Sequence, residues 1–530
     1  MNAIPFSNKG TINLLEDIDF LAKKWNFKIL NEFYIKNNID SSIDQDLISS
    51  YTSDWSNIPN GFAEILVRPK SAKECSVVLT SCYKCNIPVT ISGARTNLTG
   101  SATPFGGLIL STENLLSPKI DVDIEKKIAS CSAGVILEDL RNKVINESKN
   151  YLYYPVDPTS RKDACIGGTI SCNASGFVPG IKGSTRYWVE EINLVLINGY
   201  SSKIRRGQYR SCTEGKFKLI CNKKIHEITI PNYKRPKIKN ASGPYSAYDE
   251  SIDFIDFIVG SEGIFGLITS CKLKLTEKPK ELLDLFITFK SEKEALKFHD
   301  FLYNFFKNDL SKLNAMEYFG YNCQNYMNNN DYFFKNQNDV GLYIQYPIFD
   351  TDLEKSIEMW TKIIIKHNPE FDLDNVIILN EKNNFNMFFD SRHSLPDNAL
   401  SKTKRLGSVS IITDTIVPKT NFKIYLNKIH QRLKKEKIEY ILFGHLGDCH
   451  LHFHLIPAKT QEQKALLVYD YMVDLCSILG GIYSAEHGTG KRKRVDFEKC
   501  YGNDAVKMLR EAKKSIDRKY LLNVGNIIEP

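Results

Sequence analysis

The chain has 530 residues, of which 42% are hydrophobic and 11% aromatic, a composition typical of a globular protein with two or three packed domains. Its net charge of +8 comes from lysines spread along the chain, which gives no reason to expect a nucleic-acid partner. The 13 cysteines lack the spacing of a disulfide framework, and no apolar stretch approaches the roughly 20 residues that span a bilayer. We therefore expect a cytoplasmic protein without a transmembrane segment, and peripheral contact with the inner membrane stays open.

The order of predicted elements divides the chain into four parts. Residues 1–55 are polar, with a helical pattern over residues 14–33, and we interpret them as an N-terminal extension. Short β-branched runs then alternate with helical stretches, which predicts an α+β domain over residues 56–276. The predicted helices and strands of this domain lie at residues 71–86, 89–93, 107–110, 128–134, 137–147 and 192–199.

The second half of the chain differs in amino-acid composition. Residues 277–470 are rich in aromatic residues, lysine and asparagine, and they are predicted to form a second domain. Within it, the stretch 321–339 carries seven asparagines and is predicted to be a long loop. Residues 471–530 form a separate C-terminal segment that includes a helical run of lysine, arginine and glutamate.

Three loops rich in glycine and small hydroxyl residues follow strands of the first predicted domain. They cover residues 92–101, 157–176 and 259–268. Successive backbone N–H groups in such loops can approach an anion closely, so the three together favour a bound diphosphate. None of them places Gly-x-Gly-x-x-Gly between a strand and a helix, which argues against a nicotinamide-binding Rossmann domain.

Half of the ten histidines lie between residues 445 and 487. Alternation places His450, His452 and His454 on one strand face. If the chain reverses tightly after the preceding Gly-Asp turn signal, His445 lies across the hairpin from His452, so two imidazoles converge as a metal site requires. Glu486 then completes a set of two histidines and one carboxylate. A lone histidine is more often a hydrogen-bonded structural residue, but the joint spacing favours a site.

The motifs, taken in order, resemble the FAD-linked oxidases of the vanillyl-alcohol-oxidase type, with a PCMH-type FAD-binding domain. Within them the chain is similar to the D-2-hydroxy-acid dehydrogenase branch, which includes D-lactate and D-2-hydroxyglutarate dehydrogenases and the flavin subunit of glycolate oxidase. The motifs that carry the resemblance are Arg68-Pro69, Gly93 to Gly100, Ile166-Gly167-Gly168, Gly260-Ser261-Glu262-Gly263, Gly444-His445-Leu446-Gly447-Asp448, Glu486-His487-Gly488-Thr489-Gly490 and Leu522-Asn523-Val524-Gly525.

The resemblance implies an α+β fold with a two-lobed FAD-binding domain, a cap domain that carries an antiparallel sheet and the substrate site, and a C-terminal segment that completes the flavin site. Some members hold FAD through a histidine of the first loop. This chain has none there, so FAD is expected to be non-covalent. The residues expected to bind it are Gly93, Arg95, Thr96, Asn97, Thr99, Gly100, Asp157, Gly167, Gly168, Ser171, Asn173, Gly176, Glu262, Gly263, Ile268 and Asn523.

The implied reaction is the oxidation of a D-2-hydroxy acid, such as lactate or glycolate, to the 2-oxo acid. By resemblance, His445, His452 and Glu486 bind a divalent metal, with zinc favoured over manganese, iron or cobalt. His487, with an ordinary pKa of about 6.5, is suited to accept the hydroxyl proton, and Arg392 falls where the family binds the substrate carboxylate. Electrons would pass from the flavin to a quinone, a cytochrome or an electron-transfer flavoprotein.

The chain departs from its relatives at several positions of this site. Cys449 and His450 replace the usual glycine and asparagine of Gly-Asp-Gly-Asn-Leu-His, and the loss of that glycine should alter the turn. His454 stands where the 2-hydroxyglutarate enzymes have asparagine, and Ile412 where they have lysine, which argues against a second substrate carboxylate. Two other functions stay open: a non-redox flavin transferase of the alkyl-glycerone-phosphate-synthase type, and a zinc-binding protein with a vestigial flavin site.

Overall fold

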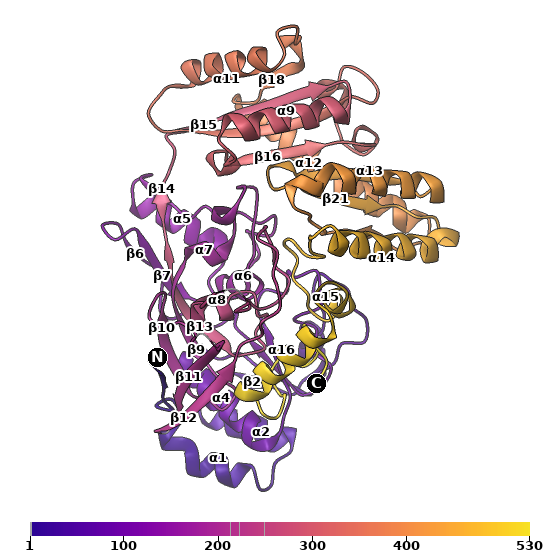
Figure 1. Ribbon diagram of the computed structural model, residues 1–530. Coiled ribbons are helices and arrows are strands. Elements are labelled where there is room, and N and C mark those ends of the chain that lie inside the picture. Colours follow the sequence, from indigo (N-terminus) through magenta and orange to yellow (C-terminus); the bar gives the residue numbers. More distant parts are fainter. Residues whose placement is uncertain (1–2, 213, 222, 249) are drawn as a thin grey trace.

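The computed structural model describes residues 3–212, 214–221, 223–248 and 250–530, and it consists of a lower and an upper body (Figure 1). The chain first builds the lower body, then the upper body in its orange segment, and returns to the lower body in yellow. In the described part of the chain, no helix is both long and apolar enough to cross a membrane.

A four-stranded sheet forms one lobe of the lower body, in the order β2-β3-β5-β4. The strand β5 runs parallel to both of its neighbours, and its residues are buried on both faces, as parallel strands require. Helix α4 matches the predicted helix: Ser71 accepts a hydrogen bond from the N–H of Glu74 at its start, and Asn86 ends it in the left-handed conformation. The bounds are β2 (Ser41–Ser42), β3 (Ile65–Val67), α4 (Ala72–Cys85), β4 (Val89–Ser92) and β5 (Leu108–Ser111).

The second lobe is a five-stranded antiparallel sheet in the order β10-β9-β13-β7-β6. It shares one hydrophobic core with the first lobe, so the two sheets and their helices pack as one body. The bounds are β6 (Asp121–Asp123), β7 (Ile128–Ser132), α5 (Leu137–Glu147), β8 (Leu152–Tyr153), α6 (Ile166–Cys172), α7 (Thr185–Trp188), β9 (Val189–Val195), β10 (Ser201–Arg205), α8 (Phe254–Ile258), β13 (Leu267–Lys274) and β14 (Thr276–Glu277).

The N-terminal residues pack against this core instead of extending away from it. Strand β1 pairs in parallel with β11, and Ile18, Leu30 and Tyr34 are fully or almost fully buried. Only part of each short helix faces the core: the buried residues are Ile18 and Leu21 on α1, and Leu30 and Tyr34 on α2. The elements concerned are β1 (Ile4–Phe6), α1 (Leu15–Leu21), α2 (Phe27–Lys36), α3 (Gln45–Ser49), β11 (Lys216–Cys221) and β12 (Lys224–Thr229).

The upper body is built on a seven-stranded antiparallel sheet in the order β18-β15-β17-β16-β20-β21-β19. Helices α9, α11, α13 and α14 pack on one face, and α12 packs on the other. The bounds are β15 (Glu281–Phe289), α9 (Glu292–Phe305), β16 (Ala315–Phe319), β17 (Val340–Ile348), α11 (Leu353–His367), β18 (Val376–Ile378), α12 (Lys382–Arg405), β19 (Ile411–Ile412), α13 (Lys419–Glu436), β20 (Tyr440–His445), β21 (His450–Leu455) and α14 (Glu462–Ile478).

The asparagine-rich stretch 321–339 is more structured than the predicted long loop. It contains a short 3₁₀ turn and helix α10 (Asn330–Phe333). Phe333 is buried, and its ring lies 5.4 Å from Phe286 on β15 and 5.6 Å from Phe388 on α12. The aromatic residues among the asparagines therefore fix this segment against the sheet, and the asparagine count alone misled the prediction.

The C-terminal segment returns to the first lobe, as Figure 1 shows in yellow. Helices α15 (Arg494–Tyr501) and α16 (Asn503–Ile516) contribute apolar side chains to the core of the lower body. The backbone then pairs with β4: the N–H of Val89 donates to Leu521 at 2.7 Å, and the N–H of Asn523 donates to Val89 at 2.8 Å. This pairing places Asn523 beside the first glycine loop.

The hairpin β20–β21 carries the histidines, with a register that differs from the prediction. His445 lies opposite His450, and His452 lies opposite Phe443, so His445 and His452 are diagonal neighbours. The cause is the turn: residues 446–448 form a 3₁₀ turn and Cys449 adopts the left-handed conformation, with φ of 57°. Cysteine thus takes the conformation that glycine adopts most readily.

The two faces of β21 are confirmed as predicted. Leu451, Phe453 and Leu455 belong to the core beneath α13 and α14, whereas the alternating histidines face the α12 side of the sheet. Packing of the apolar face therefore fixes the position of β21, and the opposite face of the same strand carries the histidines.

Replacing Phe453 with alanine tests this support, because it removes a fully buried ring from behind the histidines without touching them. We expect Phe453→Ala to lower the free energy of unfolding by about 3–5 kcal/mol. Denaturant unfolding followed by circular dichroism measures the loss. Leu467→Ala on α14, where the side chain is 52% exposed, is the control, and an equally small loss in both variants would contradict the expectation.

Candidate active site

A cavity of about 380 Å³ lies among the glycine-rich loops. All three loops contribute to its wall, together with the C-terminal segment and two residues of the motif at 486–490. The structure thereby brings together segments that are separated by hundreds of residues. The residues of the wall that were predicted to bind a cofactor are Gly93, Arg95, Thr96, Asn97, Gly167, Gly168, Ser171, Glu262, Gly263, Ile268 and Asn523.

The other predicted cofactor residues do not line this cavity. The carbonyl of Thr99 accepts a hydrogen bond from the N–H of Lys491 at 2.9 Å, and the carboxylate of Asp157 pairs with Arg161 at 2.7 Å. Such contacts fix the shape of the loops. The residues in this position are Thr99, Gly100, Asp157, Asn173 and Gly176.

Glu262 joins the first glycine loop to the C-terminal segment. Its buried carboxylate accepts hydrogen bonds from the hydroxyl of Ser101 at 2.5 Å and from the N–H groups of Thr489 and Gly490, both at 2.7 Å. Its carbonyl accepts from the amide of Asn523 at 2.8 Å. Burial raises the pKa of Glu262, and these donors oppose the rise. The cavity wall is therefore held by one buried residue.

The wall of the cavity fits a flavin dinucleotide. Glycine, alanine, serine and threonine leave the backbone of the loops accessible, which suits a diphosphate, and Trp55, Ile91 and Leu267 supply an apolar surface for a ring system. The first two glycine loops also pack closely on each other, because a Cβ atom at Gly93 would lie 2.7 Å from the sulfur of Cys165.

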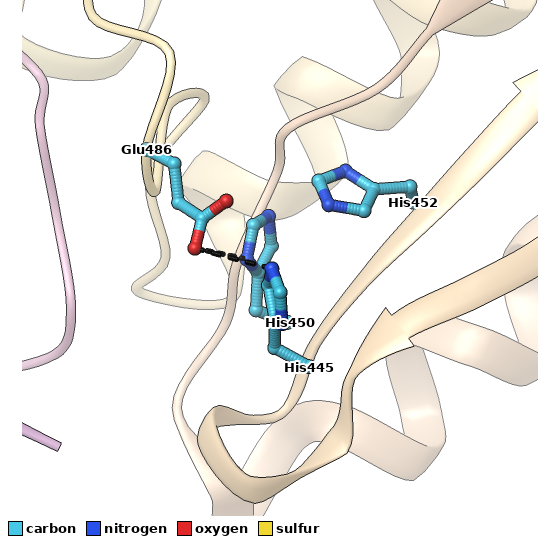
Figure 2. Close-up of side chains that lie close together, drawn as sticks. All are labelled: His445, His450, His452 and Glu486. Carbon is cyan, nitrogen blue, oxygen red and sulfur yellow. Dashed lines mark ion pairs between the residues drawn. The ribbon is translucent and has the colours of Figure 1, made fainter. Parts of the chain in front are cut away.

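A second group of side chains converges beside this cavity. One ligand atom each of His445, His450, His452 and Glu486 lies within 4.8 Å of the others. Figure 2 shows the carboxylate of Glu486 pointing toward the rings of His445 and His450, with His452 farther along the hairpin. The three predicted ligands are brought together, and His450 joins them.

The predicted histidine ligands are held in the orientation that a metal requires. Nδ1 of His445 lies 2.5 Å from a carboxylate oxygen of Glu317, and Nδ1 of His452 lies 2.9 Å from the carbonyl oxygen of Thr413. Each ring can donate its Nδ1 proton outward and keep the Nε2 lone pair for a cation. Nε2 of His445 lies 3.3 Å from Glu486. The donor set therefore fits a divalent metal.

Glu317 on β16 is a residue of the site that sequence reasoning missed. It is buried and binds His445 with one carboxylate oxygen and Arg392 of α12 with the other, at 2.9 Å. Burial alone would raise its pKa, but the charges of His445 and Arg392 hold it at about 2. Arg392 also lies over the ring of Phe177, 4.5 Å from its centre. The sequence feature that could have pointed to Glu317 is its position as a single charged residue in the apolar run Ala-Met-Glu-Tyr-Phe.

Asp414 was also missed, and it fixes the motif at 486–490. Its fully buried carboxylate accepts hydrogen bonds from Ser484 at 2.7 Å, from the N–H of His487 at 2.9 Å and from Lys493 at 3.1 Å. Burial opposes its ionisation, but the charges of His487 and Lys493 hold its pKa well below the usual range. Asp414 therefore orients the turn that carries Glu486.

Lys239 is a third residue without a sequence signal. Its ammonium group is buried, 2.5 Å from Glu486 and 3.2 Å from Asp448. Burial would lower the pKa of Lys239, but the two carboxylates raise it, so the lysine stays charged. It supplies a fixed positive charge next to the Oε1 atom of Glu486.

His487 links the two halves of the site. It lines the cavity among the glycine loops, and its ring lies 5.7 Å from that of His452, with an angle of 2° between the planes. Its Nδ1 atom lies 3.6 Å from Asp414. Burial lowers the pKa of His487 to about 4, in spite of Asp414.

Comparison with known proteins agrees with this arrangement. A family model described as the FAD-binding domain matches residues 63–204, and one described as the C-terminal domain of FAD-linked oxidases matches residues 345–527. The chain carries both domains of the FAD-linked oxidases. The FAD-binding match falls within the lower body, which has the PCMH-type fold, and the C-terminal match spans much of the upper body and the returning segment.

Curated proteins similar to this chain match along most of their length. The glycolate oxidase subunit GlcD of Bacillus subtilis is 27% identical, with 92% of this chain and 94% of that protein covered. A D-lactate dehydrogenase of Anaerostipes hadrus is 24% identical, with 88% and 89% covered. The mitochondrial D-2-hydroxyglutarate dehydrogenase of Rattus norvegicus is 23% identical, with 91% and 81% covered.

A solved structure shares the fold. An alkyldihydroxyacetonephosphate synthase superposes with a TM-score of 0.64 at 13% identity, with 94% of this chain and 83% of that chain covered. At this identity the likeness concerns the arrangement of the elements.

Gly263 tests whether the cavity holds FAD. Its φ is 73°, and a Cβ atom there would collide with the amide of Asn523, whereas Gly207 has a similar φ of 79° and open space around it. Both alanine variants carry a backbone strain of about 1–3 kcal/mol, so their difference reports the collision. We expect Gly263→Ala to weaken FAD binding by about tenfold or more. Titration of the FAD-free proteins with FAD measures the affinity. Equal affinities in the two variants would contradict the assignment of this cavity as the FAD site.

Proposed function

We propose that the protein is an FAD-dependent dehydrogenase that oxidises a small D-2-hydroxy acid, of the lactate or glycolate kind, to the 2-oxo acid. The observation that carries the proposal is the position of His487, which lines the glycine-loop cavity and stacks on the histidine group. A substrate bound between the glycine-loop cavity and the histidine group would have the base His487 on one side and the redox cofactor on the other. Relatives named D-lactate dehydrogenase and glycolate oxidase subunit support the substrate class.

The cofactors supply chemistry that side chains lack. When bound, non-covalent FAD accepts the two electrons of the oxidation, and a divalent metal at His445, His452 and Glu486 makes the substrate hydroxyl more acidic. Zinc suits this set of nitrogen and oxygen donors, as do manganese, iron and cobalt. The acceptor that reoxidises the protein would be a quinone, a cytochrome or an electron-transfer flavoprotein.

His487 takes the hydroxyl proton in this proposal. Its Nδ1 atom faces Asp414, 3.6 Å away, so Nε2 is the nitrogen left for the substrate. Asp414 also accepts a hydrogen bond from the backbone N–H of His487, which fixes the position of the backbone that carries the imidazole ring. A base held in this way transfers a proton without first having to be oriented.

Arg392 binds the substrate carboxylate in this proposal. Glu317 accepts a hydrogen bond from its Nη2 atom and is its one hydrogen-bond partner among the described residues, so other N–H groups of the guanidinium stay available. Because Glu317 also contacts His445, the carboxylate anchor and the metal ligand are held by the same side chain. The alcohol and the carboxylate of one small molecule would thereby be placed together.

The far end of the hairpin favours a substrate without a second charged group. Ile412 on β19 pairs with His454, and burial lowers the pKa of His454 to about 4. Neither side chain carries a positive charge at neutral pH. A monocarboxylate therefore suits the site better than a dicarboxylate such as 2-hydroxyglutarate.

Anaerobic reduction of the flavin by a panel of 2-hydroxy acids tests the function. We expect D-lactate or glycolate to bleach the flavin absorbance, L-lactate and D-2-hydroxyglutarate to act poorly, and a metal chelator to abolish bleaching until zinc is restored. Stopped-flow absorbance measures each rate. A flavin that every acid leaves oxidised would refute the proposal and favour a non-redox transferase, and a protein that binds no FAD would favour a zinc-binding protein.

The base is tested by His487→Ala. We expect the rate of flavin reduction to fall by about 100- to 10,000-fold, the usual contribution of a general base, while FAD stays bound. His226→Ala on β12, in the three-stranded sheet of the lower body, serves as the control and should reduce at the wild-type rate. Reduction of the His487 variant at that same rate would show that another group takes the proton.

A further inference from the structure

His450 is fully buried, and one of its ring nitrogens has no hydrogen-bond partner. Its exposure is 0%; Nε2 lies 3.2 Å from a carboxylate oxygen of Asp414, but Nδ1 has no partner within hydrogen-bond distance among the described residues. Buried imidazoles normally donate one N–H and accept at the other nitrogen, because an unmet polar atom in the interior loses the hydrogen bonds that water would provide. The Nδ1 atom of His450 therefore lacks the hydrogen-bond partner that a buried imidazole nitrogen normally has.

Both nitrogens of the ring face groups that are suited to metal chemistry. Nδ1 lies 4.0 Å from Oε1 of Glu486, on the side of the convergent group, and Nε2 lies 3.2 Å from Oδ1 of Asp414 on the other side. His445 and His452 have the same arrangement, with an outer acceptor on one nitrogen and the cluster at the other. The hairpin register places His450 directly opposite His445, so the two rings come from paired positions.

We propose that His450 is a fourth protein ligand of the metal, which makes the site one of three histidines and one carboxylate. In this arrangement Nδ1 would bind the cation while Nε2–H donates to Asp414, so both ring nitrogens would have a partner. The inference rests on the metal site of the proposed function and deepens it. The four ligand atoms lie within 4.8 Å of one another, so binding of an ion would draw them closer together.

A third imidazole changes which metal the site prefers. Imidazole nitrogens favour zinc and cobalt, whereas an oxygen donor such as an asparagine amide suits manganese better. We therefore expect this chain to bind zinc more tightly, relative to manganese, than a His450→Asn variant does.

Metal binding tests the inference without measuring turnover. The purified FAD-containing protein is stripped with a chelator and titrated with zinc and with manganese against an indicator dye. We expect His450→Asn to raise the Kd for zinc by about tenfold or more and the Kd for manganese by less. His454→Asn changes a buried histidine four residues after His450, on the same strand face and outside the group; it is the matched control and should bind zinc as the wild type does.

X-ray absorption at the zinc edge counts the imidazoles in the wild-type protein, so it does not depend on how well a variant folds. Three imidazoles support the inference. Two imidazoles, or an unchanged zinc Kd in a folded His450→Asn variant, overturn it and leave the two-histidine site of the proposed function standing. If the wild-type protein binds neither zinc nor manganese, both the three-histidine and the two-histidine metal site are refuted. Flavin reduction by hydroxy acids then tests the dehydrogenase proposal separately.

Discussion

The burial of Asp414 beneath the turn of residues 484–487 is the interaction on which the candidate site depends. One carboxylate accepts hydrogen bonds from a serine hydroxyl, from a lysine and from the backbone of the turn, and it stands 3.2 Å from His450 of the hairpin. The turn belongs to the C-terminal segment and the hairpin belongs to the upper body. Because a buried charge is stable only when its partners surround it, the carboxylate fixes the relative position of these two parts.

The charges around the histidines are nearly balanced before any cation is added. Four carboxylates of Glu317, Asp414, Asp448 and Glu486 face three cations, those of Lys239, Arg392 and Lys493. Without a metal the remaining negative charge favours a proton on His445, whose pKa Glu317 and Glu486 raise to about 9 against the effect of burial. A divalent ion would compete with that proton, which is the usual coupling between metal affinity and pH.

Local patterns in the sequence were enough to predict much of the fold. The helix after Ser71 has its cap and its apolar face within one stretch, and the alternation of β21 assigns its two faces without further information. The glycine loops could be recognised because a backbone that approaches an anion needs small residues nearby in the sequence. The histidine group could be recognised for the same reason, since His450, His452 and His454 alternate along one short strand and His445 lies just before it.

Other parts of the site could not be predicted, because they depend on distant pairings. Glu317, Asp414 and Lys239 each stand alone in the sequence, and only the packing of β16, β21 and the C-terminal turn gives them partners. The hairpin register was predicted incorrectly because the length of a turn depends on its backbone conformation, and a left-handed cysteine at position 449 is not evident from composition. His450 was left without a role because it departs from the related motif, although the observed register places it opposite His445.

The pairing of residues 521–523 with β4 has a consequence for how the protein matures in the cell. Domains fold as they emerge during synthesis, so the glycine loops of residues 92–268 are available long before the segment that carries Glu486, His487 and Asn523. Until that segment arrives, the cavity lacks part of its wall and Glu262 lacks the backbone donors at residues 489 and 490. The cavity wall is therefore complete only after the segment that carries residues 486–523 has been translated and has packed against the glycine loops.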